Sequence, residues 1–233
     1  MDFNQAIKLK PDFVEAYSNR GIAYGRQGNS TQAITDYGQA LKLKPDAAKV
    51  YYNRGNAYGM QGNSTQAIAD FTQALKIEPD DALAYNNRGN AYTTQGNFTK
   101  AIADYTQALK IEPKFAEAYN NRGIAYAKRG NFSQAIADYT QALKIKPNLA
   151  DAHNNRGSAY AMQGDSTKAI ADFNQALKLK PDSANAYLGR GAAYRLSGDK
   201  INAIQDFKRT LALTQNLTIR QAAEQNLQGL RAQ

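Results

Sequence analysis

The sequence predicts an all-α protein built from repeated helix pairs, and three observations support this fold class. Successive prolines lie 34 residues apart, at Pro11, Pro45, Pro79, Pro113, Pro147 and Pro181. Two series of glycines and one series of alanines keep the same spacing. Within each period, two stretches with helical periodicity flank a short turn that contains glycine. Self-similarity at a fixed period of this length is typical of solenoid proteins.

One period shows how each helix pair is built. In its first half, Tyr85, Gly89 and Tyr92 fall on one face of a helix. Gly96 then marks a turn, because glycine readily adopts the left-handed conformation that ends a helix. The second helix carries an apolar stripe made of Ala101, Ile102, Tyr105, Ala108, Leu109 and Ile111. Pro113 ends this helix and starts the next unit.

The repeated residues resemble the consensus of the tetratricopeptide repeat family. In the same period the matching residues are Tyr85, Gly89, Tyr92, Gly96, Ala101, Tyr105, Ala108 and Pro113. The resemblance covers nearly the whole chain. It implies antiparallel helix pairs stacked into a right-handed superhelix, an α-solenoid, whose concave groove is lined mainly by the first helices. Near-identical repeats of this kind also resemble bacterial arrays, so we expect a bacterial, cytoplasmic protein.

The period divides the chain into one partial repeat, six complete repeats and a terminal helix. Residues 1–13 match the second helix of a repeat, so we expect the chain to begin in mid-repeat. The complete repeats are placed at 14–47, 48–81, 82–115, 116–149, 150–183 and 184–217. Residues 218–233 carry apolar side chains on one face and are predicted to cap the stack. The partial repeat predicts exposed apolar surface and end-to-end self-association.

The composition excludes several classes of function. The chain has no Cys, which excludes a disulfide framework, a thiolate metal site and a Cys nucleophile. We see no signal peptide and no apolar run long enough to span a membrane. His153, the single histidine, is expected to pack in the core because other repeats have Tyr at its position. Since we find no nucleophile–base pair, phosphate loop or metal cluster, we expect no enzymatic activity, cofactor or metal.

Two charged series occupy fixed positions in the repeats. The first helices carry Arg20, Arg54, Arg88, Arg122, Arg156 and Arg190, and the second helices carry Asp36, Asp70, Asp104, Asp138, Asp172 and Asp206. An Arg guanidinium can bind a carboxylate through two parallel hydrogen bonds, so these rows predict a ladder of ion pairs. The alternative is an anion-binding Arg stripe. The net charge of +9 comes mostly from lysines near the ends of the second helices, where they complement the helix dipole.

A row of asparagines on the first helices is the predicted functional feature, and it consists of Asn19, Asn53, Asn87, Asn121 and Asn155. Asn is not favoured inside a helix by propensity, so a repeated Asn needs an explanation. Its amide has a donor and an acceptor and can pair with both polar groups of a peptide unit. The row is similar to the asparagine ladder inside the tetratricopeptide superhelix of O-GlcNAc transferases, and Gly189 interrupts it. The alternative is that these amides only tie neighbouring repeats together.

The family resemblance implies further groove positions, which are Lys49, Tyr52, Asn56, Asn86, Asn90, Asn120, Lys128, Asn154 and Ser158. Their side chains would make a polar and largely neutral surface. We therefore predict a protein-interaction scaffold that binds an extended peptide segment of a protein partner, whose identity the sequence leaves open. The alternative is a basic solenoid that binds nucleic acid or an acidic surface through its Arg and Lys rows.

Overall fold

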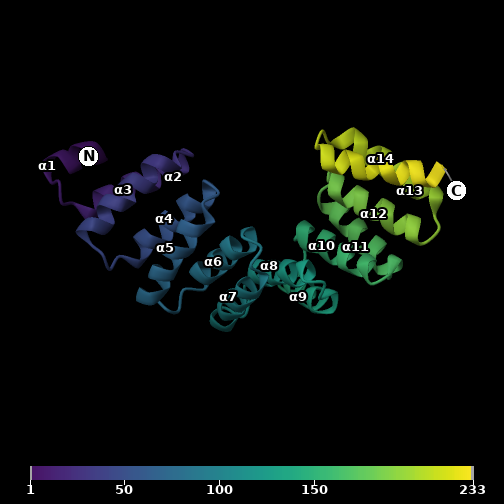
Figure 1. The fold of residues 1–233 in the computed structure, drawn as a ribbon, viewed down its shortest axis with the longest axis horizontal. Helices are drawn as coiled ribbons and strands as arrows, with labels where there is room; N and C mark the ends of the chain where they lie inside the picture. Colours follow the sequence, from purple (N-terminus) through teal and green to yellow (C-terminus); the bar gives the residue numbers. More distant parts are fainter. Residues whose placement is uncertain (1, 232–233) are drawn as a thin grey trace. The chain divides into compact units, whose positions relative to one another are not determined.

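The computed structural model describes residues 2–231, which form fourteen α-helices and no β-strand (Figure 1). The chain divides after Pro113 into two compact units. The first unit contains α1 (Phe3–Leu9), α2 (Val14–Arg26), α3 (Ser30–Leu43), α4 (Ala48–Met60), α5 (Ser64–Ile77), α6 (Ala82–Thr94) and α7 (Phe98–Ile111). The second contains α8 (Ala116–Lys128), α9 (Phe132–Ile145), α10 (Ala150–Met162), α11 (Ser166–Leu179), α12 (Ala184–Leu196), α13 (Lys200–Leu213) and α14 (Leu217–Arg231).

Consecutive helices pack as antiparallel pairs, and each pair packs on the next pair of its unit. The turn inside a pair is tight because a glycine there adopts a positive φ, 74° at Gly96. The following helix is capped by a polar side chain, and Asn97 Oδ1 accepts from the Lys100 backbone N–H at 3.2 Å. The predicted all-α solenoid of helix pairs is confirmed.

Small residues allow the two helices of a pair to lie close together. Ala101 and Ala108 are completely buried, and Tyr105 is 1% exposed. The Tyr105 ring lies directly on Gly89, where an added Cβ would stand 2.7 Å from the ring. Because real Cβ contacts are never this short, the glycine makes room for the aromatic ring. The periodic residues of the Gly89, Ala101, Tyr105 and Ala108 series therefore belong to the core.

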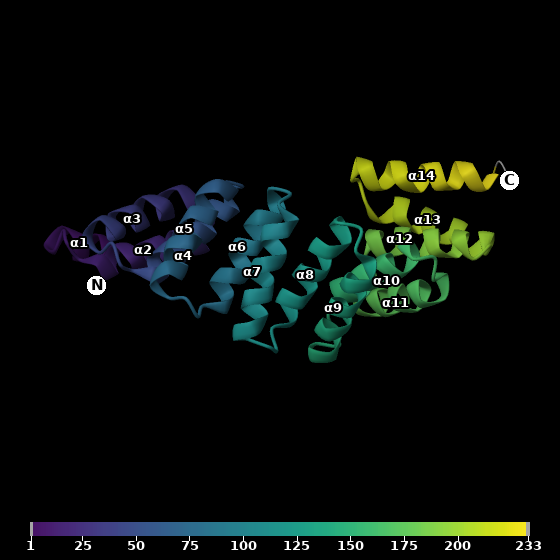
Figure 2. The same ribbon diagram turned by 60° about the horizontal axis from the view of Figure 1, so that its bottom comes forward.

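The two ends of the described chain differ in how much they bury. Helix α14 packs on α13 and α12 (Figure 2), and its Ala223, Leu227 and Leu230 are buried. In contrast, α1 has no buried residue, and Leu9 is 65% exposed. Met1 and residues 232–233, which belong to the predicted terminal segments 1–13 and 218–233, lie outside the described residues. No helix within 2–231 has both the length and the apolar character needed to cross a membrane.

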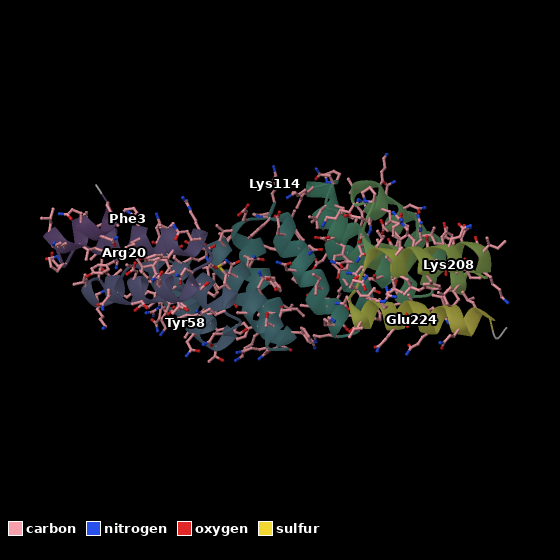
Figure 3. The ribbon with its side chains drawn as sticks, turned by 90° about the horizontal axis from the view of Figure 1, so that it is seen from above. Phe3, Arg20, Tyr58, Lys114, Lys208 and Glu224 are labelled. Atoms are coloured by element: carbon pink, nitrogen blue, oxygen red, sulfur yellow. The ribbon has the colours of Figure 1, made fainter. Side chains whose placement is uncertain are left out.

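An ion pair joins the two helices of every pair from α2–α3 to α12–α13. Arg54, for example, donates from Nε and Nη2 to the two carboxylate oxygens of Asp70, at 2.7 and 2.8 Å. Arg20, which begins this series, is labelled in Figure 3. The six pairs are Arg20–Asp36, Arg54–Asp70, Arg88–Asp104, Arg122–Asp138, Arg156–Asp172 and Arg190–Asp206. The carboxylates are buried, and their hydrogen bonds raise the pKa of each Arg. The predicted ladder of ion pairs is confirmed.

The remaining guanidinium nitrogen, Nη1, links one helix pair to the pair before it. Arg88 Nη1 donates to Thr72 Oγ1 on α5 at 3.1 Å. At the equivalent position on α3 stands Gly38, which offers Arg54 no side-chain acceptor. A Cβ added to Gly38 would lie 4.0 Å from Arg54 Nη1. The junction between α3 and α4 therefore lacks a hydrogen bond that the next junction has.

We expect Gly38→Thr to be more stable than Gly38→Val by about 1 kcal/mol, because only the threonine hydroxyl can accept from Arg54. Both variants remove a glycine from a helix interior, and both residues have similar helix propensities. The measurement is the midpoint of urea unfolding followed by circular dichroism. Equal midpoints for the two variants would show that no hydrogen bond forms.

Three buried tyrosines on the second helices have raised pKa values. Burial, with a smaller effect of the adjacent Asp carboxylate, raises the pKa of Tyr37 to about 12. Burial also raises the pKa of Tyr105 to about 12, and it raises that of Tyr139. The ordinary value is 10.0, so the unfolded chain loses these protons first. Their contribution to stability is therefore complete below pH 10 and is lost as the pH rises toward 12.

We expect the urea midpoint of the wild-type chain to fall as the pH rises from about 10 to about 12. The matched control is Tyr37→Phe/Tyr139→Phe, because Phe71 shows that the ring fits at this position without its hydroxyl. This double variant should lose less stability over the same pH interval. A fall as steep as in the wild type would mean that other groups cause it.

Candidate functional site

The first helices of successive pairs approach one another more closely than the second helices do. In the first unit α2 contacts α4 and α4 contacts α6, and in the second unit α8 contacts α10 and α10 contacts α12. Among the described residues of either unit, no second helix contacts another second helix. Because elements on the inner side of a curved stack are closer together, the first helices line the inner surface of each unit.

Members of the asparagine row bridge neighbouring first helices across this inner surface. Asn87 Nδ2 on α6 donates to Tyr52 OH at 3.1 Å and to Asn56 Oδ1 at 3.0 Å, both on α4. Asn155 Nδ2 on α10 donates to Asn120 Oδ1 on α8 at 3.2 Å. An amide nitrogen has two N–H groups, so both donors of Asn87 are used, whereas Asn155 uses one.

Neighbouring asparagines on the same helix extend this polar network. Asn86 Nδ2 donates to Asn87 Oδ1 at 3.2 Å, and Asn120 Nδ2 lies 3.5 Å from Asn121 Oδ1. Asn86 is 6% exposed, so its amide is largely removed from solvent. Tyr52, Asn56, Asn86 and Asn87 therefore form one hydrogen-bonded network in the first unit, and Asn120, Asn121 and Asn155 form another in the second.

The first two members of the row differ from Asn87. Neither Asn19 nor Asn53 makes a side-chain hydrogen bond to the described residues. Tyr52 and Asn56 accept the hydrogen bonds of Asn87. One repeat earlier, opposite Asn53, their positions are occupied by Ser18 and Ile22. Ser18 is too short to replace a tyrosine hydroxyl, and Ile22 has no polar atom. The amides of Asn19 and Asn53 thus keep their donors and acceptors.

The row ends at Asn155 for a structural reason. The next member would stand at Gly189, and the acceptor waiting for it, Asn154 Oδ1, is buried without a partner in the described chain. An added Cβ at Gly189 would lie 2.5 Å from the Phe173 ring. The Phe173 ring lies in the space beside Gly189, and the network ends there because glycine has no side-chain amide to donate.

Two cavities open beside the asparagine row, one in each unit. Their lining residues occupy equivalent positions of the repeat, two repeats apart in the sequence. The first has a volume of about 360 Å³ and is lined by Gly55, Asn56, Gly59, Met60, Ser64, Ala67, Phe71, Asn87, Asn90, Ala91 and Thr94. The second has a volume of about 270 Å³ and is lined by Ile124, Ala127, Lys128, Phe132, Tyr139, Asn155, Ser158, Ala159 and Met162. The second cavity has the bulkier apolar lining.

The structure distributes the predicted site residues over three environments. The cavities contain Asn56, Asn87, Asn90, Lys128, Asn155 and Ser158. The hydrogen-bonded network contains Tyr52, Asn86, Asn120 and Asn121. Lys49 is exposed on α4 and lines neither cavity.

Sequence reasoning did not single out the residues that form the cavity floors. Phe71 and Tyr139 close the two cavities from the second helices, and they belong to the core aromatic series. Phe132 and Met162 narrow the second cavity, where Ser64 and Thr94 stand in the first. The sequence signal that could have found them is a change of residue size at two fixed positions of the repeat.

His, Cys, Asp and Glu side chains do not gather into a metal-binding cluster within residues 2–231. No group of three His, Cys, Asp or Glu side chains there could hold a metal ion. The ring of His153 is half-buried, with Nδ1 3.2 Å from Asp172 Oδ1 and Nε2 3.0 Å from the Pro147 carbonyl oxygen. These contacts hold the ring in place between helices α10 and α11, as expected for a packing residue.

We expect Asn87→Ala to reduce the free energy of unfolding by about 1–2 kcal/mol, because it removes two donated hydrogen bonds. The matched control is Asn53→Ala, which removes no hydrogen bond and replaces Asn by a better helix former. This control should be neutral or slightly stabilising. Urea unfolding of both variants checks the difference, and equal losses would contradict the network.

Comparison with known proteins agrees with this geometry. Family profiles described as "TPR repeat" match residues 2–28, 26–62, 89–130 and 125–164. Profiles described as "Tetratricopeptide repeat" match residues 48–81, 71–103 and 150–183. Together these matches cover well over half of the chain. A comparison with curated proteins finds no match.

Solved structures of repeat proteins share the fold. The chain is similar to a chain of the APC/C hetero-tetramer Cut9–Hcn1, with a TM-score of 0.80 and 20% identity over 98% of this chain, and it spans 44% of that chain. It is similar to YrrB, with a TM-score of 0.67 and 24% identity over 80% of this chain and 96% of that one. It is also similar to PilF of Pseudomonas aeruginosa, with a TM-score of 0.78 and 17% identity over 94% of this chain and 96% of that one. The profile matches show that the chain belongs to the tetratricopeptide repeat family.

Proposed function

We propose that the chain is a protein-interaction scaffold that holds an extended segment of a partner on the inner surface of its first helices. Proteins of the tetratricopeptide repeat family mediate interactions with proteins or peptides. One structural neighbour, YrrB, is described as having an unusual peptide-binding site. For this chain, the proposal depends on the side chains of the inner surface.

The observation that carries the proposal is the unused amide of Asn53, which stands on α4 about one helical turn before Asn56 of the cavity lining. Its donor and acceptor match the C=O and N–H of one extended peptide unit. Asn19 offers the same pair of groups on α2, one repeat earlier. Because amides recognise the backbone, the two residues would accept many sequences, and the cavity lined by Met60 and Phe71 would accept a side chain.

Asn87 and Asn155 would contribute in a different way. Asn87 spends both donors on α4, so only its oxygen can serve a peptide. Asn155 keeps one N–H and offers its oxygen beside the second cavity. Each net hydrogen bond contributes roughly 0.5–1.5 kcal/mol, and ordering a flexible peptide opposes binding. We therefore expect dissociation constants on the order of micromolar.

The structure gives less support to binding of nucleic acid. Each Arg of the row donates two hydrogen bonds to a buried Asp, so these cations are neutralised inside the helix pairs. The Lys side chains at the ends of the second helices are left to attract phosphates. End-to-end self-association through the exposed Phe3 and Leu9 of α1 stays a prediction.

The test begins with an array of diverse unstructured peptides and continues with the tightest binder. Its affinity is measured by fluorescence polarisation for the wild type, for Asn19→Ala/Asn53→Ala, and for the control Asn185→Ala. We expect the double variant to bind about tenfold more weakly, since two rungs are lost. Asn185 is exposed on α12 and lies outside the row, so its variant should bind normally. Undiminished binding by the double variant would reject the proposed site.

A further inference from the structure

A third cavity lies in the first unit, at the edge where second helices end. It has a volume of about 820 Å³ and is formed by the end of α5, the start of α6 and the end of α7. Its apolar side chains include Ile77, Leu83 and Ile111. Leu83 is 51% exposed and Ile77 is 38% exposed. This edge is separate from the asparagine row, and it combines an apolar floor with acidic groups.

Two of these acidic groups stand where a carboxylate is electrostatically unfavourable. Glu78 is the C-cap of α5, and Glu112 is the C-cap of α7. The C-terminal end of a helix carries partial negative charge and favours a cation. Other second helices of the chain have Lys at this position, as Lys44 in α3 and Lys146 in α9. The two glutamates are therefore unfavourable for the stability of α5 and α7, and the helix dipole does not explain their presence.

In some repeats an ion pair at this edge joins the C-cap of the second helix to the first helix, but Glu112 has no such ion pair within residues 2–231. In the second unit, Lys146 Nζ lies 2.9 Å from Oε1 of Glu117, which stands 29 residues earlier on α8, the first helix of the same pair. The residue 29 positions before Glu112 is Leu83, which has no charge. Lys49 holds the corresponding position for Glu78, but no ion pair joins them. Within the described chain, neither Glu78 nor Glu112 lies in an ion pair.

We propose that this edge cavity, defined by Ile77, Glu78, Leu83, Ile111 and Glu112, binds a partner segment in which an apolar side chain is flanked by Lys or Arg. The apolar side chain would cover Leu83 and Ile77. A flanking cation would stand opposite Glu112, at the place that Glu117 takes opposite Lys146 in the second unit. The site complements the proposed peptide-binding inner surface and does not depend on it. In a chain with a net charge of +9, it supplies a local attraction for basic segments.

The experiment uses three fluorescein-labelled peptides and the full chain. In the first peptide a leucine is flanked on both sides by lysines, in the second the flanking residues are glutamates, and in the third the leucine is replaced by serine. Binding is measured by fluorescence polarisation for the wild type and for Leu83→Lys. This substitution removes the apolar side chain of Leu83 from the cavity and places a cation opposite Glu112. We expect only the first peptide to bind the wild type, and we expect Leu83→Lys to weaken it at least tenfold.

Two control variants keep this test separate from folding and from the inner surface. Ile201→Lys changes another apolar residue, 73% exposed on α13, and should leave binding unchanged. Asn19→Ala/Asn53→Ala should also bind the first peptide as the wild type does. Circular dichroism checks that each variant is helical. Equal binding of the leucine and serine peptides, or undiminished binding by a folded Leu83→Lys, would overturn the proposal.

Discussion

The structure depends on a buried ion pair between the two helices of each repeat. Every Arg of the row holds both oxygens of an Asp on the following helix, and the Asp is almost fully removed from water. Leaving one partner of such a pair alone would cost roughly 3–5 kcal/mol, because a charge would stay buried without compensation. The pair therefore fixes the relative position of the two helices, and Nη1 of Arg88 extends the constraint to the preceding pair through Thr72.

This constraint also determines which side chains remain for binding. The guanidinium groups point into the helix pairs, so the inner surface keeps uncharged amides in place of a positive stripe. There the amides compete between two partners, the neighbouring helix and a bound peptide. Asn87 is committed to α4, whereas Asn53 is uncommitted, and the difference arises from the residues opposite them. A surface of this kind favours recognition of backbone over recognition of charge.

Departures from the repeat carry most of the specific information in a chain whose repeats are nearly alike. Gly38 removes an acceptor that Thr72 supplies one pair later. Gly189 ends the asparagine row and leaves Asn154 Oδ1 buried without a partner in the described chain. Leu83 removes a charge opposite Glu112 and opens an apolar edge. Each departure is visible because the other repeats show what the position otherwise does.

The sequence by itself determined the helices, their pairing and the pairing of the Arg and Asp rows. These features follow from local rules, since proline and glycine end helices and residues sixteen apart face each other across one short turn. The tertiary structure alone decided which asparagines are free and where cavities open. Those properties depend on contacts between successive pairs, such as Asn87 with Tyr52, 35 residues apart. Periodicity places every asparagine in the same row, but the size and polarity of the side chain opposite decide whether its amide is available.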